Sequence, residues 1–84
     1  MNTLKDIIIE YDLPAFDDLD NAIVGFTEIN NKYKLVYDIE LCISEIMNLY
    51  KLKYIDAQEY FAYNIENSYI GDNTPIFIHK TNSL

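Results

Sequence analysis

The feature that most constrains the fold is a pair of short strand-like segments joined by Asn30-Asn31. Successive side chains of a β-strand point to opposite faces, so residues 22–29 place Ala22, Val24 and Phe26 on one face and Ile23, Gly25 and Thr27 on the other, and residues 32–37 read as the partner strand. Asparagine tolerates the positive φ values that a two-residue hairpin turn requires. Such a turn pairs Phe26 with Leu35 and Val24 with Tyr37, so that apolar faces coincide. The pattern therefore predicts a β-hairpin.

Helical spacing flanks this hairpin on both sides. An apolar stripe predicts a helix over residues 3–11, with Thr3 as its N-cap and an end before Pro14. Asp38 suits the N-cap of a second helix, whose apolar stripe runs to Tyr50. A third helix is expected over residues 54–69. Its stripe consists of Ala57, Tyr60, Phe61, Asn64, Ile65 and Ser68.

The last part of the chain predicts a turn and a short strand. Gly71 fits the position just past a helix end, and the strand is expected over residues 76–79. Asn64 falls on a face expected to be buried, where we expect it to hydrogen-bond the loop of residues 72–74. The order is α-β-β-α-α-β. We therefore predict a single α+β domain over residues 1–84, with a small antiparallel three-stranded sheet packed against helices.

The charge of the chain excludes several classes of function. Among its 84 residues are 14 acids and 6 basic residues, all of them lysine, which gives a net charge of −8. We therefore expect no direct binding to nucleic acid and none to an anionic membrane. No apolar run is long enough to cross a bilayer, and we see no signal peptide. A single cysteine suits a reducing cytosol. The absence of arginine also fits an AT-rich bacterial or viral genome, because the abundant Ile, Asn, Lys and Tyr have AT-rich codons.

Four short pieces of the sequence occur together in one known family. They are Asp20-Asn21-Ala22-Ile23-Val24-Gly25, then Tyr37-Asp38 before Cys42-Ile43, then Glu59-Tyr60-Phe61 before Tyr63-Asn64, and Gly71 before Thr74-Pro75-Ile76-Phe77. In this order the chain resembles a widespread family of small acidic proteins of tailed phages, prophages and their bacterial hosts, most of them without a recorded function. The resemblance covers roughly residues 18 to 78.

The chain also departs from that family. The family tends to have Gly-Met where this chain has Lys51-Leu52, and small residues at the positions of Asn67 and Ser68. The last turn of the third helix is therefore expected to pack differently here. The resemblance implies a phage context and a host bacterial cytosol, and it brings no established chemistry.

Two groups of residues invite a chemical interpretation, and for both we prefer a structural one. Asp17, Asp18 and Asp20 carry oxygen ligands for a hard cation, but they lack the regular ligand spacing of a calcium loop and read better as a solvated loop. Cys42 and His79 are the residue types of a nucleophile and its base. Cys42 nevertheless lies on an apolar stripe, where cysteine acts as a small hydrophobe. We predict no metal, no cofactor and no enzymatic activity.

Tyrosines and outward-facing acids give the broadest functional signal. Tyr33, Tyr50, Tyr54, Tyr63 and Tyr69 are too many for the core of so small a domain, and tyrosine is favoured at interfaces. The predicted protein-binding residues are Asp56, Glu59, Tyr63, Glu66, Glu40, Glu45 and Tyr54. Spaced acids of this kind also raise the question of mimicry of a nucleic-acid phosphate row. An acidic surface with tyrosines suits a basic protein partner.

The leading hypothesis is a phage or prophage accessory protein that binds a basic host protein, such as a nucleic-acid-binding component of a CRISPR-Cas defence system. It would then act as an inhibitor. The alternative is a structural or regulatory phage module that associates with a second copy of itself as a homodimer. A small hydrolase or nucleotide-binding protein ranks last, because the sequence has neither a glycine-rich phosphate loop nor a histidine cluster.

Overall fold

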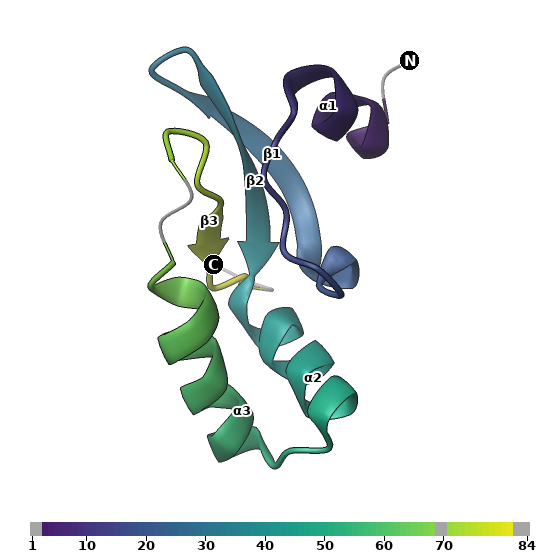
Figure 1. Cartoon of the computed structure of the whole chain (residues 1–84), viewed down its shortest axis with the longest axis vertical. Coiled ribbons are helices and arrows are strands. Elements are labelled where there is room, and N and C mark those ends of the chain that lie inside the picture. Colours follow the sequence, from purple (N-terminus) through teal and green to yellow (C-terminus); the bar gives the residue numbers. More distant parts are fainter. Residues whose placement is uncertain (1–2, 69–70, 82–84) are drawn as a thin grey trace.

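The structure is a computed structural model that describes residues 3–68 and 71–81. The elements are α1 (Leu4–Tyr11), the 3₁₀ turn η1 (Asp20–Ala22), β1 (Ile23–Ile29), β2 (Lys32–Asp38), α2 (Ile39–Tyr50), α3 (Tyr54–Phe61), the π-helical turn η2 (Ala62–Glu66) and β3 (Ile76–Ile78). The predicted α+β class and the order α-β-β-α-α-β are confirmed. The sheet lies at one end of the molecule, and the α2–α3 hairpin extends from it (Figure 1).

The hairpin forms around Asn30 and Asn31, as the sequence predicts. Both residues have positive φ values, 52° and 66°. Phe26 lies opposite Leu35, as expected, but the predicted pairing of Val24 with Tyr37 is wrong. A bulge between Ile23 and Gly25 places Ile23 opposite Tyr37, so that Val24 is the extra residue. β1 begins at Ile23, one residue later than predicted, because Ala22 belongs to the 3₁₀ turn η1.

The sheet is mixed, and the predicted antiparallel arrangement holds only for β1 and β2. β3 pairs with β2 in parallel, with Phe77 opposite Tyr37. The reason is the loop before β3: Asn73 Nδ2 donates a hydrogen bond to the Tyr33 carbonyl oxygen at 2.8 Å. The chain therefore lies beside the beginning of β2 before β3 starts, and β3 then runs in the direction of β2 (Figure 1).

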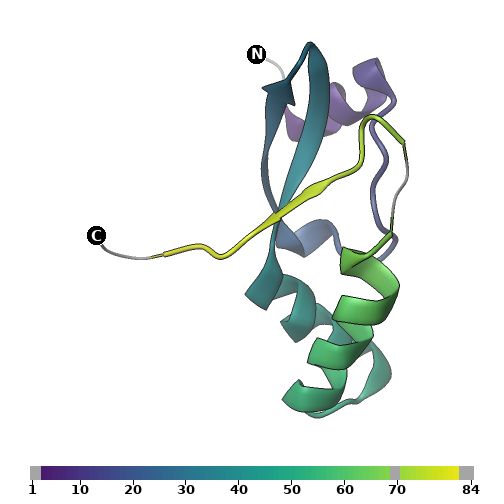
Figure 2. The ribbon, with the colours of Figure 1, turned by 90° about the vertical axis from the view of Figure 1, so that its left-hand side faces the viewer.

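The first two helices begin where the sequence predicts. Thr3 and Asp6 form a reciprocal capping box at the start of α1. Asp38 caps α2, because its Oδ2 accepts the Leu41 N–H at 2.9 Å. α1 and the segment after it lie on one side of the sheet, and α2 follows β2 directly (Figure 2).

The third helix differs from the prediction in length and in pitch. The regular α-helix ends at Phe61 and continues as a π-helical turn to Glu66, while Tyr69 lies outside the described residues. The wider turn breaks the 3.6-residue spacing on which the predicted stripe rests. Gly71 therefore does not follow the helix directly. With φ of 120° it opens the turn to β3, in which the Thr74 N–H donates to its carbonyl oxygen.

Asn64 shows the consequence of that change in pitch. The prediction that it is buried and bonds the loop of residues 72–74 is wrong. Asn64 is exposed, and its Nδ2 donates to the Tyr60 carbonyl oxygen at 3.1 Å. The side chain that connects the loop to the sheet is Asn73.

The core lies where the sheet meets the helices. Its buried apolar side chains are Ile7, Leu13, Leu19, Ala22, Leu35, Tyr37, Ile39, Cys42, Ile43, Ile46, Ala57 and Phe61. Tyr37 is fully buried, and its hydroxyl accepts the Phe16 N–H at 3.0 Å. The Phe77 ring packs on both Tyr37 and Phe61, with centroid distances of 5.6 and 5.2 Å. Aromatic packing thus joins β2, β3 and α3.

We predict that Asp38→Ala lowers the free energy of unfolding by about 2 kcal/mol, the sum of a lost N-cap and a lost part-buried hydrogen bond. Asp38 is 4% exposed, and its Oδ1 accepts the Lys80 N–H at 3.2 Å in addition to the cap. Urea unfolding measures the change. Asp38→Asn should lose less, because it keeps one oxygen for the cap.

Glu59→Ala is the matched control, because Glu59 is exposed on α3. We expect it to change the free energy of unfolding by less than about 0.5 kcal/mol. Equal unfolding midpoints for Asp38→Ala and Glu59→Ala would contradict this role of Asp38.

Candidate functional site

The acidic and tyrosine residues predicted for α3 lie on the surface. Asp56, Glu59 and Glu66 are exposed. Tyr63, on the π-helical turn, is 78% exposed, the largest exposed fraction among the large apolar and aromatic side chains that the structure describes. A ring so placed offers a large contact area with a polar tip to another protein.

Glu40 and Tyr54 connect the two helices of the helical hairpin. The Tyr54 hydroxyl lies 3.1 Å from each carboxylate oxygen of Glu40 and donates to that group. This hydrogen bond, followed by burial and the charge of Glu40, raises the pKa of Tyr54 above its ordinary value. Glu40 and Glu66 line one groove between α2 and α3, of about 210 Å³, together with His79. The structure therefore brings Glu40 into contact with Tyr54 and into the same groove as Glu66.

Glu45 does not belong to that group. It lies five residues after Glu40 on α2, which turns it about 140° around the helix axis. Its carboxylate faces η1, where Asn21 Nδ2 donates to it at 3.5 Å. The predicted set of seven residues is therefore divided between two sides of α2.

The sequence predicts that Tyr33, Tyr50, Tyr54, Tyr63 and Tyr69 cannot all be core, and three of the four that the structure describes are exposed. Tyr50, Tyr54 and Tyr63 are exposed, and Tyr33 is half-buried beside the Tyr11 ring at 4.2 Å. Tyr69 lies outside the described residues. The fully buried tyrosine is Tyr37, which faces the core from β2.

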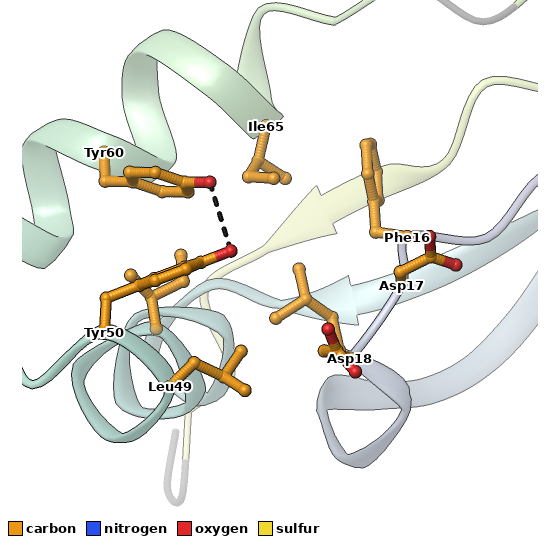
Figure 3. Close-up of a pocket in the computed structure, with 9 residues that line it drawn as sticks. Phe16, Asp17, Asp18, Leu49, Tyr50, Tyr60 and Ile65 are labelled. Atoms are coloured by element: carbon orange, nitrogen blue, oxygen red, sulfur yellow. Dashed lines mark hydrogen bonds between the residues drawn. The ribbon is translucent and has the colours of Figure 1, made fainter.

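A second hollow was not predicted from the sequence. It measures about 330 Å³ and lies between the α2–α3 hairpin and the loop before η1 (Figure 3). Its lining residues are Phe16, Asp17, Asp18, Leu19, Ile46, Leu49, Tyr50, Tyr60 and Ile65. The two hollows share no lining residue. We call this second hollow the tyrosine pocket.

The tyrosine pocket has an aromatic wall and an acidic wall. The Tyr50 and Tyr60 rings lie 5.0 Å apart, and the Tyr60 hydroxyl donates to that of Tyr50 at 3.4 Å. Asp17 and Asp18 stand across the opening from these rings (Figure 3). The acidic loop interpreted from the sequence as solvated is thus also one side of a pocket. The pocket forms because the loop packs against two helices, which bring together residues that are far apart in the chain.

Cys42 and His79 do not form a site together. Cys42 is fully buried, whereas His79 is exposed after β3 and lines the Glu40–Glu66 groove without Cys42. Burial, followed by the charges of Asp38 and Glu45, raises the pKa of the Cys42 thiol to about 12. At neutral pH this thiol is protonated and is a poor nucleophile.

The described residues offer no ready metal site. Within residues 3–68 and 71–81, no group of three or more His, Cys, Asp or Glu side chains is arranged to hold a metal ion. Within the same residues, no helix has the length and apolar character that a bilayer span requires.

In comparisons with known proteins, no family model matches the chain, and no curated protein and no solved structure matches it. The phage-family resemblance therefore stays a prediction from the four sequence pieces.

We predict that the Cys42 thiol of the native protein resists alkylation and reaction with a disulfide reagent at about pH 8, because it is buried and its pKa is about 12. Stopped-flow absorbance measures the reaction. The same protein in urea should react fully, with a pKa near the ordinary cysteine value. Prompt stoichiometric labelling of the native protein would show that the thiol is accessible.

Proposed function

We propose that this chain is a phage or prophage accessory protein that binds a basic protein in the host bacterial cytosol and inhibits it. A component of a bacterial defence system that binds nucleic acid, such as a CRISPR-Cas nuclease complex, has the required basic surface. The single observation that carries the proposal is the exposed surface of α3 and η2, where Asp56, Glu59 and Glu66 accompany the 78% exposed Tyr63.

The physical basis is electrostatic complementarity together with an aromatic anchor. A chain of net charge −8 attracts a basic groove over long range and associates quickly with it. Tyr63 then supplies the desolvated contact that charge alone does not, because tyrosine is among the residues that dominate interface energies. The hydrogen-bonded Glu40 and Tyr54 extend this surface to α2.

We predict that reversing the charge of Asp56, Glu59 and Glu66 to lysine weakens binding to a purified CRISPR-Cas complex about tenfold or more at physiological salt. Biolayer interferometry gives Kd, and a DNA cleavage assay gives inhibition. The control reverses Glu10, Glu28 and Asp72, which are exposed elsewhere and change the net charge equally. It should change Kd less than about threefold, because only long-range attraction is lost.

Two outcomes would contradict the proposal. If both sets of charge reversals weakened binding equally, binding would depend on the net charge of the chain and not on the α3 surface. The proposed function would also be contradicted if the protein bound no tested defence complex and did not protect a phage in a host that carries such a system.

Self-association is a second candidate, supported by the edge of the sheet. Within residues 3–68 and 71–81, β1 pairs only with β2, and its exposed side chains include Val24, Phe26 and Ile29. Neither lysine nor proline, which protect many edge strands from pairing, occurs in β1. An antiparallel β1–β1 contact would continue the sheet into a second copy.

For this alternative we expect a dimer in native mass spectrometry at high micromolar concentration, and a monomer for Phe26→Lys, which places a charge at the centre of the contact. Tyr63→Lys, on the far surface, should leave the dimer intact. A wild-type protein that stays monomeric would exclude self-association through β1.

A further inference from the structure

The lining of the tyrosine pocket favours a positively charged group. Ile46 and Leu19 form an apolar floor and are nearly fully buried, at 1% and 2% exposure. The tilted pair of Tyr50 and Tyr60 rings stands on one side, and the two carboxylates stand on the other (Figure 3). No basic side chain is among the described residues that line it.

The two carboxylates are not engaged within the described structure. Neither Asp17 nor Asp18 has a hydrogen bond or an ion pair to a residue in 3–68 or 71–81. The Asp18 charge nevertheless acts across the pocket. The pKa of Tyr50 is raised first by the hydrogen bond from Tyr60, then by the Tyr60 charge and by burial, and also by the charge of Asp18. The pocket thus combines two tyrosine rings with uncompensated negative charge.

We propose that the tyrosine pocket receives an arginine side chain of a partner protein. A guanidinium group stacks on tyrosine faces and forms paired hydrogen bonds with carboxylates, while its methylene stem packs on apolar side chains such as Leu49 and Ile65. An anion is repelled by Asp17 and Asp18, and a neutral apolar group leaves both carboxylates without a partner.

The occupant must come from another chain, because this chain contains no arginine. Arginine suits the pocket better than lysine, since its planar group stacks on rings and is more weakly hydrated. The assignment rests on the proposed function in one respect, namely that the partner is a basic protein. The chemistry of the pocket itself is testable without that partner.

The test is a titration with the blocked tripeptide Gly-Arg-Gly, followed by amide chemical shifts in a ¹⁵N–¹H NMR spectrum. We expect saturable shifts at Asp18, Leu49 and Tyr50, with a Kd in the millimolar range, which corresponds to about −4 kcal/mol. The same peptide with citrulline, which has the shape of arginine without its charge, should bind about tenfold more weakly.

Variants locate the binding. Asp17→Asn with Asp18→Asn should weaken the arginine peptide about tenfold, and asparagine tolerates the positive φ of 66° at position 18. Glu10→Gln with Glu28→Gln removes the same charge from exposed positions outside the pocket and should leave the Kd unchanged. Equal binding of the citrulline peptide, no saturation, or shifts confined to residues outside the pocket such as Asp56, Glu59 and Tyr63 would overturn the proposal. Equal binding of a lysine peptide would overturn the assignment to arginine.

Different results would contradict the arginine pocket and the proposed function. Binding of the arginine peptide with no binding of any defence complex would leave the pocket standing without the function. A defence complex that binds the Asp17→Asn/Asp18→Asn variant with wild-type affinity would leave the function standing without the pocket.

Discussion

The structure depends on Tyr37 and Asp38, the last two residues of β2, which connect the sheet to α2 and to the segments before β1 and after β3. Tyr37 faces the core, where its hydroxyl holds the Phe16 backbone and its ring packs against Phe77 of β3. Asp38 caps α2 with one oxygen and holds the Lys80 backbone with the other. A β-strand presents successive side chains to opposite faces, so these two neighbours hold the segment before β1 and the segment after β3 at once. The position of the α2–α3 hairpin, and with it both pockets, follows from this junction.

Local patterns predicted the elements well because each one carries its own signal. The Asn30-Asn31 turn set the pairing of Phe26 with Leu35, and Thr3 and Asp38 marked two helix starts. The pairing of Val24 with Tyr37 failed because a bulge inserts one residue without any mark in the alternation. The direction of β3 failed for a related reason. It is decided by a contact between Asn73 and Tyr33, which lie 40 residues apart, and no local period reports such a contact.

The candidate site divides along the same line. Exposed Asp56, Glu59 and Tyr63 were predicted because an outer helix face follows from spacing, and the Tyr54–Glu40 bond was not, because it joins two helices. The burial of Asn64 was wrong since the π-helical turn at η2 changes the pitch of the helix. The same change leaves Tyr63 on the surface while Ile65 lines the tyrosine pocket. That pocket has no signal in the sequence, since its acidic wall and its aromatic wall are separate segments that only the fold brings together.

The distribution of charge separates the two proposed kinds of binding. Residues 23–37 of the β-hairpin carry Glu28 against Lys32 and Lys34, so the acids that give the chain its net charge of −8 lie outside the hairpin. Both pockets of the helical hairpin have acids among their lining residues: Glu40 and Glu66 in one, Asp17 and Asp18 in the other. A basic partner is therefore attracted to the helical end of the molecule, because the potential of that end dominates the encounter. The edge of β1 lies at the other end, in a hairpin whose residues 23–37 carry one acid and two lysines. The proposed binding of a basic protein and the proposed pairing through β1 thus involve different surfaces, and one does not exclude the other.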